Sequence, residues 1–168
     1  MTTGGNLPAA AARVKAALES AGHPAEIRLF AESTRTAQEA AEAIGTTVAQ
    51  IAKSLVFRTS ETNRPVLAIA SGANRIDEKK LAKALAQATG GEAMMRADAD
   101  FVRRTTGYAI GGVPPVGHAA GPLVAIDKDL VAFDEVWAAA GTPNAVFRTT
   151  GSALAGLTGG TTADIARR

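Results

Sequence analysis

Hydrophobic and polar residues along the chain follow two periods, which predict helices in some segments and strands in others. Segments with helical spacing begin at a proline or at a side chain that caps a helix, and several end at glycine. They cover residues 8–22, 36–45 and 77–90, and a further helix begins at Asp98. Apolar runs with strand character cover residues 26–30, 51–58, 65–70, 123–127 and 145–149. Residues 135–140 fit a strand or a helical turn, and short helical turns are expected to finish the chain.

The polar stretch 59–64 separates the two clearest strands and predicts a hairpin loop, so these strands are expected to pair antiparallel. The order of elements predicts an α/β (α+β) protein, with a mixed, mostly antiparallel sheet or barrel-like core flanked by helices. Because 168 residues suit one ordinary domain, we expect a single domain over residues 7–168. Residues 1–6 are expected to form a disordered tail.

Composition narrows the class of protein. Apolar residues make up 46% of the chain but aromatic residues only 4%, so the core is expected to consist mainly of Val, Ile, Leu and Ala. Eighteen basic and 16 acidic side chains leave a net charge of +2, too small for a protein that wraps nucleic acid by charge alone. Any contact with RNA must therefore be local. The absence of cysteine excludes disulfides, thiol nucleophiles and thiolate metal sites.

The sequence also lacks the patterns typical of membrane proteins, metal-binding proteins and nucleotide-cofactor enzymes. No run of 18 apolar residues occurs, and charged residues interrupt the alanine-rich segment 8–22, so neither a membrane span nor a signal peptide is predicted. A cytoplasmic protein is the expectation. The two histidines, His23 and His118, lie far apart in sequence, and no zinc, Walker or dinucleotide motif is present. We therefore expect no metal and no cofactor.

The most distinctive segment runs from Arg104 to His118 and contains four glycines and two prolines. Glycine lets the backbone approach a ligand closely, and proline stiffens the path. Residues 106–110 are expected to form a short strand that leads into the loop, where the amides of Gly111, Gly112 and Val113 would face a substrate. The alternative is a tight connection whose glycines only permit a positive φ, the commoner meaning of an isolated glycine pair. The density of the motif favours the ligand site.

Strand periodicity places Lys53 on an apolar face beside Ile51, Leu55 and Phe57. Burying an unpaired ammonium is costly, so such a lysine reaches solvent at an edge, pairs with a carboxylate, or lines a cavity that takes an anionic or carbonyl group. The spacing alone leaves a solvated and a functional lysine equally open.

The glycine-rich loop resembles the signature of the YbaK/EbsC-type aminoacyl-tRNA editing domains, which hydrolyse wrongly aminoacylated tRNA and also occur inserted in bacterial prolyl-tRNA synthetases. Segments 51–57, 77–85 and 162–168 resemble further family blocks in family order. The resemblance covers nearly the whole chain after about residue 25. It implies a YbaK-like fold and a free-standing deacylase that removes a small wrong amino acid from the acceptor end of mischarged tRNA, with tRNA for proline as the expected substrate. Prolyl-tRNA synthetase is the candidate partner.

The resemblance also implies roles for residues of this chain. Lys53 occupies the place of the family's active-site lysine in a Lys-[Ser/Thr]-Leu block, where it would hold the terminal adenosine phosphate or the ester. The amides of Gly111 and Gly112 would stabilise the oxyanion while water attacks. No Gly-x-Ser-x-Gly elbow and no thiol supports a covalent route. The candidate substrate-binding residues are Phe30, Ser54, Val113, Pro115, Gly117 and His118.

Some of these candidates have a simpler interpretation. An aromatic residue on a strand, such as Phe30, most often belongs to the core. A loop histidine such as His118 is most often solvated, and family members can carry Gln at this place, so essential proton transfer through it is not expected. Five basic residues are candidates for acceptor-stem phosphates, although each alone is more often a solvated helix residue: Lys79, Lys80, Lys83, Arg103 and Arg104.

Residues 139–147 depart from the pattern of the members that clear cysteinyl-tRNA, which have an acidic pocket residue after a Gly-rich turn. This chain has no carboxylate there, so a cysteine-specific enzyme is not implied, and the amino acid stays open. The rival function is a non-catalytic module that binds an aminoacyl or nucleotide ligand as an accessory of a tRNA synthetase. The presence of both Lys53 and the loop favours the deacylase.

Overall fold

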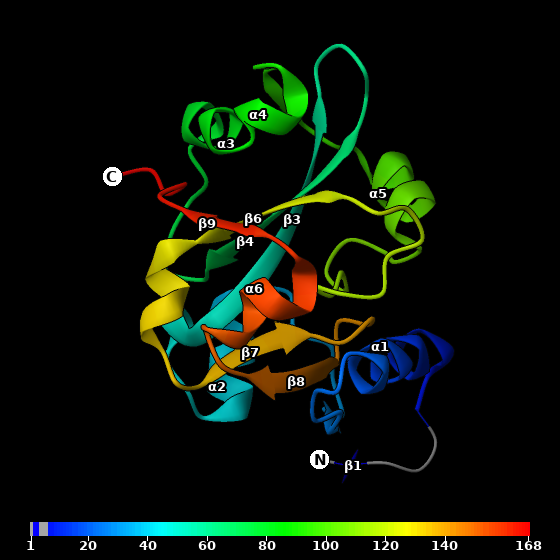
Figure 1. Cartoon of the computed structure of the whole chain (residues 1–168). Coiled ribbons are helices and arrows are strands. Elements are labelled where there is room, and N and C mark those ends of the chain that lie inside the picture. Colours follow the sequence, from blue (N-terminus) through cyan, green and yellow to red (C-terminus); the bar gives the residue numbers. More distant parts are fainter. Residues whose placement is uncertain (1, 4–6) are drawn as a thin grey trace.

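A computed structural model of the chain describes residues 2–3 and 7–168. They form one sheet with helices on both faces (Figure 1). The helices are α1 (Ala9–Ser20), α2 (Ala37–Ile44), α3 (Glu78–Ala84), α4 (Ala86–Thr89), α5 (Ala99–Thr106) and α6 (Ala153–Thr158), with 3-10 turns η1 (Val48–Gln50) and η2 (Lys128–Ala132). The strands are β1 (Thr2–Thr3), β2 (Ile27–Leu29), β3 (Ile51–Thr59), β4 (Pro65–Ser71), β5 (Met94–Arg96), β6 (Leu123–Asp127), β7 (Val136–Ala139), β8 (Ala145–Thr149) and β9 (Thr161–Ala163).

The strands follow the order β1-β2-β8-β7-β3-β4-β6-β9, and β5 also pairs with β3. The hairpin of β3 and β4 is antiparallel, as its short connection predicts, and most other neighbours are antiparallel too. The parallel pairs are β3 with β7, β4 with β6, and β6 with β9. This confirms a mixed, mostly antiparallel sheet, and the sheet stays open rather than closing into a barrel.

One edge of β3 is bare over part of its length. On this side β7 pairs with Ile51 and Ala52, and β5 pairs with β3 from Phe57 onward. Between these two partners no strand among the described residues lies beside β3, although the amide of Ala97 donates to the carbonyl oxygen of Val56 at 3.3 Å. The bare edge leaves room for a cavity in the middle of the sheet.

The predicted helix starts are confirmed by their caps. The side chain of Thr36 accepts a hydrogen bond from the amide of Glu39, and the side chain of Asp98 accepts one from the amide of Phe101. Asp77 accepts from two amides at the start of α3. Each cap satisfies helical N–H groups that have no partner within the helix, which fixes where the helix begins.

The short strand predicted at residues 106–110 is wrong. Thr106 is the last residue of α5, and its hydroxyl donates to the carbonyl of Val102 at 2.6 Å. Gly107 then ends the helix in the left-handed conformation, with φ of 86°. Such a glycine is a common helix end, so the glycine that seemed to open a strand instead closes a helix.

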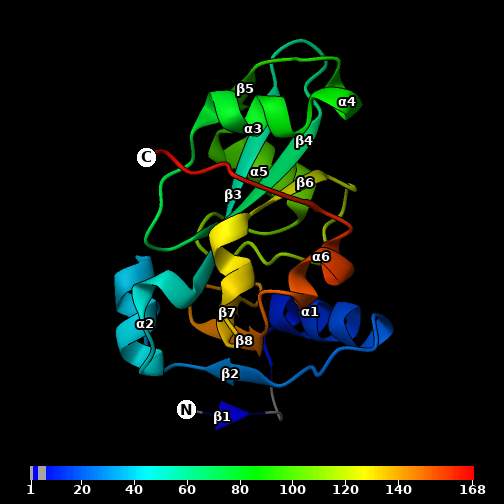
Figure 2. The same ribbon diagram turned by 60° about the vertical axis from the view of Figure 1, so that its left-hand side comes forward.

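The end of the chain differs in part from its prediction. The expected helical turn occurs as α6, but the chain then adds β9 beside β6 and passes across β3 and β4 (Figure 2). A bridge between Ile76 and Ala166 fixes this last segment. Of the tail expected at residues 1–6, residues 1 and 4–6 lie outside the described residues, and Thr2–Thr3 form β1 against β2.

The core has two main parts because successive residues of β3 point to opposite faces of the sheet. Val56 packs in a cluster with residues of α1, α5 and α6. Phe57 packs in another cluster with Leu81 of α3. Helices α3 and α5 therefore cover opposite faces of the sheet. Of the helices in the described part of the chain, none is long and apolar enough to span a bilayer.

Candidate functional site

A cavity of about 310 Å³ opens at the bare edge of β3. Its walls come from the segment that precedes α2, from β3, from the residues that follow β5, from the glycine-rich loop, and from the turn between β7 and β8. Most of the wall is apolar, and it includes Ala40, Val102, Ile110, Val113, Trp137 and Val146. An apolar cavity with a few polar groups is the usual form of a small-molecule site.

Lys53 and Ser54 both line this cavity. Neighbouring residues of a strand point to opposite faces, so the cavity reaches both side chains only by extending around the bare edge. The backbone carbonyl of Val56 points toward this edge. Because the backbone groups of residues two apart in a strand point to the same side, the N–H of Ser54 points toward the edge as well. The two predicted residues therefore contribute an ammonium, a hydroxyl and an amide to one space.

The ammonium of Lys53 is half-buried and makes no ion pair or hydrogen bond within residues 2–3 and 7–168. Burial lowers the pKa of Lys53 below its ordinary value, and the positive charges of Arg75 and Arg96 lower this pKa further. The carboxylate of Asp127 acts in the opposite direction but contributes less. The structure places Lys53 in the wall of the cavity, and a functional role for this lysine stays a prediction.

The hydroxyl of Ser54 is buried and has no hydrogen-bond partner among the described residues. A buried polar atom without a partner costs free energy unless a bound molecule satisfies it. Its position in the cavity wall makes it a candidate contact for a polar group of a ligand.

The glycine-rich loop contributes Ile110, Gly111 and Val113 to the cavity. Gly111 is exposed with φ of 96°, and its amide has no acceptor in the described part of the chain. The amide of Gly112 instead donates to the carbonyl of Ala109 at 3.0 Å. Of the two predicted oxyanion donors, Gly111 is thus the one that is both unengaged and in the cavity wall.

Gly112 has a packing role that only glycine fills. A Cβ at this position would lie 2.7 Å from the carbonyl oxygen of Gly141 and 2.8 Å from the Cα of Thr142. The amide of Gly141 also donates to the carbonyl of Gly112 at 3.0 Å. This close contact ties the loop to the turn that follows β7.

The other end of the loop rests on α1. The hydroxyl of Tyr108 donates to the carbonyl of Gly117 at 2.9 Å, and the guanidinium of Arg13 lies over the Tyr108 ring. Arg13 also donates to the carbonyl of Gly107 at 3.0 Å. These contacts give the loop a fixed path, so the Gly111 amide is positioned before a ligand arrives.

Four predicted substrate-binding residues lie outside the wall of this cavity as the described residues form it: Phe30, Pro115, Gly117 and His118. Phe30 packs beside the buried cluster under α2, which agrees with its interpretation as a core residue. His118 is half-buried rather than solvated, and its Nε2 donates to the carbonyl of Pro114 at 2.6 Å. Burial lowers the pKa of His118, which favours the neutral ring.

The five basic residues predicted to bind RNA do not share one face. Lys79, Lys80 and Lys83 lie on α3, whereas Arg103 and Arg104 lie on α5, across the sheet. The ammonium of Lys80 is also engaged, since it donates to Asp164 and to the carbonyl of Ala166 at 2.9 Å each.

Sequence reasoning missed most of the cavity wall, including the charged and aromatic residues Arg35, Arg96 and Trp137. Arg35 directly precedes the cap of α2, and Arg96 ends a three-residue strand. Neither position carries a local pattern that distinguishes it from a solvated arginine. In the described part of the chain no group of His, Cys, Asp or Glu side chains is arranged to hold a metal ion.

Known proteins resemble this chain in sequence and in fold. Residues 31–157 match the aminoacyl-tRNA editing domain family. The uncharacterized protein YwhH of Bacillus subtilis (strain 168) is 37% identical over 125 residues, which are 74% of this chain and 76% of YwhH. A candidate trans-editing enzyme for prolyl-tRNA synthetase, of solved structure, is 43% identical with a TM-score of 0.87, over 97% of this chain and 100% of that one. The hypothetical protein APE2540 shares the fold, with 24% identity and a TM-score of 0.81 over 92% of this chain and 99% of its own.

Proposed function

Because the chain belongs to the aminoacyl-tRNA editing domain family, we propose that it is a free-standing deacylase that hydrolyses the ester of a mischarged small amino acid on tRNA. The observation that carries this proposal is the meeting of Lys53 and the unengaged Gly111 amide in one cavity. A fixed cation and an exposed amide suit a substrate whose phosphate is anionic and whose carbonyl oxygen becomes an oxyanion.

In the proposed reaction, water attacks the ester carbonyl and the bond to the ribose oxygen breaks. The products are the free amino acid and the 3′-terminal adenosine with its hydroxyl restored. The amides of Gly111 and Ser54 stabilise the oxyanion, and Lys53 holds the phosphate or the ester region by its charge. The cavity wall contains no thiol, and the Ser54 hydroxyl is hydrogen-bonded to no base among the described residues, so attack by water fits better than a covalent intermediate.

The cavity also bears on which amino acid is cleared. Mostly apolar side chains line it, and none of the described residues in its wall is acidic. A mostly apolar space favours a small apolar substrate side chain and gives a positively charged one no acidic partner. The hydroxyl of Ser54 is the contact available to the substrate's amino group or to a side-chain hydroxyl.

The expected tRNA is the one for proline, and the expected partner is prolyl-tRNA synthetase. The support is the 43% identity to a candidate trans-editing enzyme for prolyl-tRNA synthetase. The rival proposal, an accessory module that only binds an aminoacyl or nucleotide ligand, needs the same cavity but no oxyanion donor.

Release of amino acid from mischarged tRNA for proline tests the proposal. The panel carries alanine, cysteine, serine, threonine or 2-aminobutyrate, and correctly charged prolyl-tRNA is the control. We expect faster release than the spontaneous rate for at least one small amino acid. If folded protein accelerates none of them but binds a 3′-aminoacylamino adenosine analogue, which cannot be hydrolysed, the binding-module function replaces the deacylase.

A further inference from the structure

The wall of the cavity carries three positive charges, on Arg35, Lys53 and Arg96, and no negative one among the described residues. Arg35 and Arg96 are exposed, whereas Lys53 lies deeper and is half-buried. We refer to Arg35 and Arg96 as the cationic rim. Since the whole chain has a net charge of only +2, this is a local concentration of positive charge.

Neither arginine of the cationic rim has an anionic partner within the described part of the protein. The guanidinium of Arg96 lies over the ring of Phe57, 5.4 Å from its centroid, and this contact leaves its N–H groups available. The charge of Arg75 is also close enough to act on Lys53. The nearby carboxylate of Asp127 accepts hydrogen bonds from other donors, namely two backbone amides and the side chain of Asn74.

The two arginines reach the cavity from opposite ends. Arg96 lies opposite Phe57 on β3, and Arg35 precedes α2, whose residue Ala40 packs with Ile51. Phe57 lies six residue steps along the extended strand from Ile51, which is roughly 20 Å of backbone. A ligand with an anionic group for each arginine is therefore expected to be extended along the mouth of the cavity.

From this arrangement we propose that Arg35 and Arg96 bind phosphates of a single-stranded RNA 3′ end that crosses the mouth of the cavity. The inference rests on the proposed function, in which the terminal adenosine and its aminoacyl group enter the cavity. Arginine suits this role because its planar guanidinium donates two parallel hydrogen bonds to a phosphate. The assignment also differs from the basic residues of α3 and α5, which lie on two faces of the sheet.

The test compares wild type with the double variant Arg35→Gln/Arg96→Gln, and uses Lys15→Gln on α1, where Lys15 pairs with Glu19, as a control that removes a positive charge away from the cavity. The first measurement is the dissociation constant of a labelled single-stranded RNA with the 3′-end sequence of tRNA, over a range of salt concentrations. We expect weaker binding by the double variant and a salt slope smaller by about 0.7 for each phosphate that the variant no longer binds. The control keeps the wild-type slope.

The second measurement compares hydrolysis of mischarged tRNA with hydrolysis of an aminoacyl-adenosine that lacks phosphates. The double variant is expected to lose more kcat/KM on the tRNA than on the nucleoside ester, where only the effect of the Arg96 charge on Lys53 is left. Equal salt slopes for variant and wild type overturn the inference, as does an equal loss on both substrates. Failure of wild type to hydrolyse either ester contradicts the proposed function instead, and the RNA-binding measurement still decides the role of the cationic rim.

Discussion

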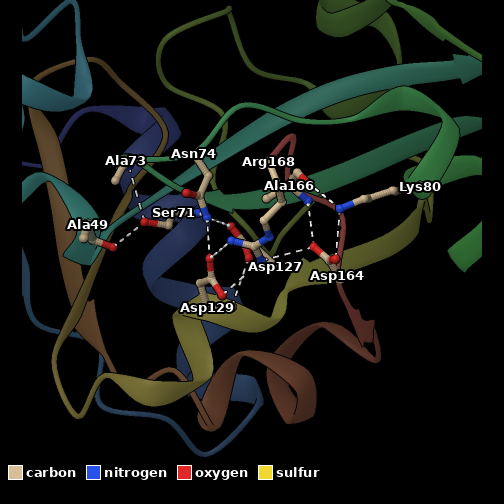
Figure 3. Close-up of polar contacts among 10 residues, drawn as sticks. All are labelled: Ala49, Ser71, Ala73, Asn74, Lys80, Asp127, Asp129, Asp164, Ala166 and Arg168. Atoms are coloured by element: carbon tan, nitrogen blue, oxygen red, sulfur yellow. Dashed lines mark hydrogen bonds and ion pairs between the residues drawn. The ribbon is translucent and has the colours of Figure 1, made fainter.

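Two groups of charged side chains lie near each other in the sheet, one around Lys53 and one around Asp127. They differ in whether their charges have partners. Lys53 pairs in register with Ala70, and the alignment of β4 with β6 brings Asp127 beside Ala70 on its other side. Around Lys53 the positive charges have no anionic partner in the described residues. Around Asp127 the charged and polar groups are joined by hydrogen bonds and ion pairs (Figure 3).

The network around Asp127 fastens the end of the chain. The fully buried carboxylate of Asp127 accepts hydrogen bonds from the amides of Ser71 and Asp129, and from the side chain of Asn74 at 2.8 Å. Arg168 forms ion pairs with Asp129 at 3.0 Å and with Asp164 at 3.1 Å. The comparison teaches that this protein pairs its charges where they hold the last segment of the chain, and leaves them without ion pairs in the wall of the cavity.

The largest expected effect on stability comes from breaking the paired side of this comparison. Asp127→Asn replaces an acceptor oxygen by an N–H₂ group that faces donors, so we expect a loss of roughly 3 kcal/mol in the free energy of unfolding. Urea denaturation measures it. Asp134→Asn, at an exposed carboxylate with no ion pair in the described structure, is the matched control and is expected to change little. A loss for Asp127→Asn no larger than that of the control contradicts this account of the network.

On the cavity side, Gly112→Ala tests whether the close contact between Gly112 and the turn after β7 stabilises the glycine-rich loop. The added Cβ would meet backbone atoms of Gly141 and Thr142, which cannot move without shifting the turn. We expect a loss of about 1–3 kcal/mol in the free energy of unfolding. Gly121→Ala is the control, because a Cβ there meets nothing within 4 Å. Unchanged stability of Gly112→Ala shows that the loop does not depend on this contact.

A smaller effect is expected from acid, which removes the stabilisation that the ionised Asp164 gives to the paired side. The hydrogen bond from Lys80, together with Arg168, lowers the pKa of Asp164 from 3.8 to about 2. Because the folded state holds this carboxylate ionised at a pH where the unfolded chain binds a proton, its stabilisation is present above about pH 4 and is lost as the pH falls toward 2. Thermal unfolding between pH 5 and 2 is therefore expected to be less steeply pH-dependent for Asp164→Asn than for wild type. Equal slopes exclude this contribution.

The smallest effects are expected for the basic residues of the helices. Lys79→Gln/Lys83→Gln on α3 and Arg103→Gln/Arg104→Gln on α5 remove exposed charges outside the cavity wall, so each pair is expected to reduce tRNA affinity less than the cationic-rim variant does. Titration of tRNA binding at one salt concentration ranks the three double variants. A larger loss for either helix pair places the main RNA contact on that helix.

Local sequence signals predicted those parts of the fold that depend on near neighbours. The caps at Thr36, Asp77 and Asp98 and the β3–β4 hairpin needed only residues within a few positions of each other. The prediction of a strand before the loop was wrong because a glycine such as Gly107 is compatible both with a strand that leads into a loop and with the end of a helix. Helix α5 extends to Thr106, so Gly107 ends a helix here. Strand β9 carries little apolar pattern and forms only against a distant partner.

The residues of the site likewise fall into those that the sequence predicted and those that depend on long-range contacts. Lys53, Ser54, Gly111 and Val113 were found from a strand pattern, a glycine-rich loop and a family resemblance, and the structure brings them to one cavity. The cavity itself exists because β5 and β7 pair with different parts of β3, which are long-range contacts that no local pattern encodes. The cationic rim depends on that same gap, so its two arginines could not be distinguished in the sequence from solvated ones.

The most direct test of the account is the single-turnover hydrolysis rate of Lys53→Met beside wild type on the best mischarged tRNA, with thermal unfolding of both. Methionine keeps the length of the side chain and removes the charge. We predict that the rate falls by about 100-fold or more. The unfolding temperature is predicted not to fall, because burial and neighbouring positive charges already disfavour the charged form of Lys53. A variant that keeps the wild-type rate, or that loses activity only because it no longer folds, would contradict the claim that the unpaired charge in this cavity serves the reaction.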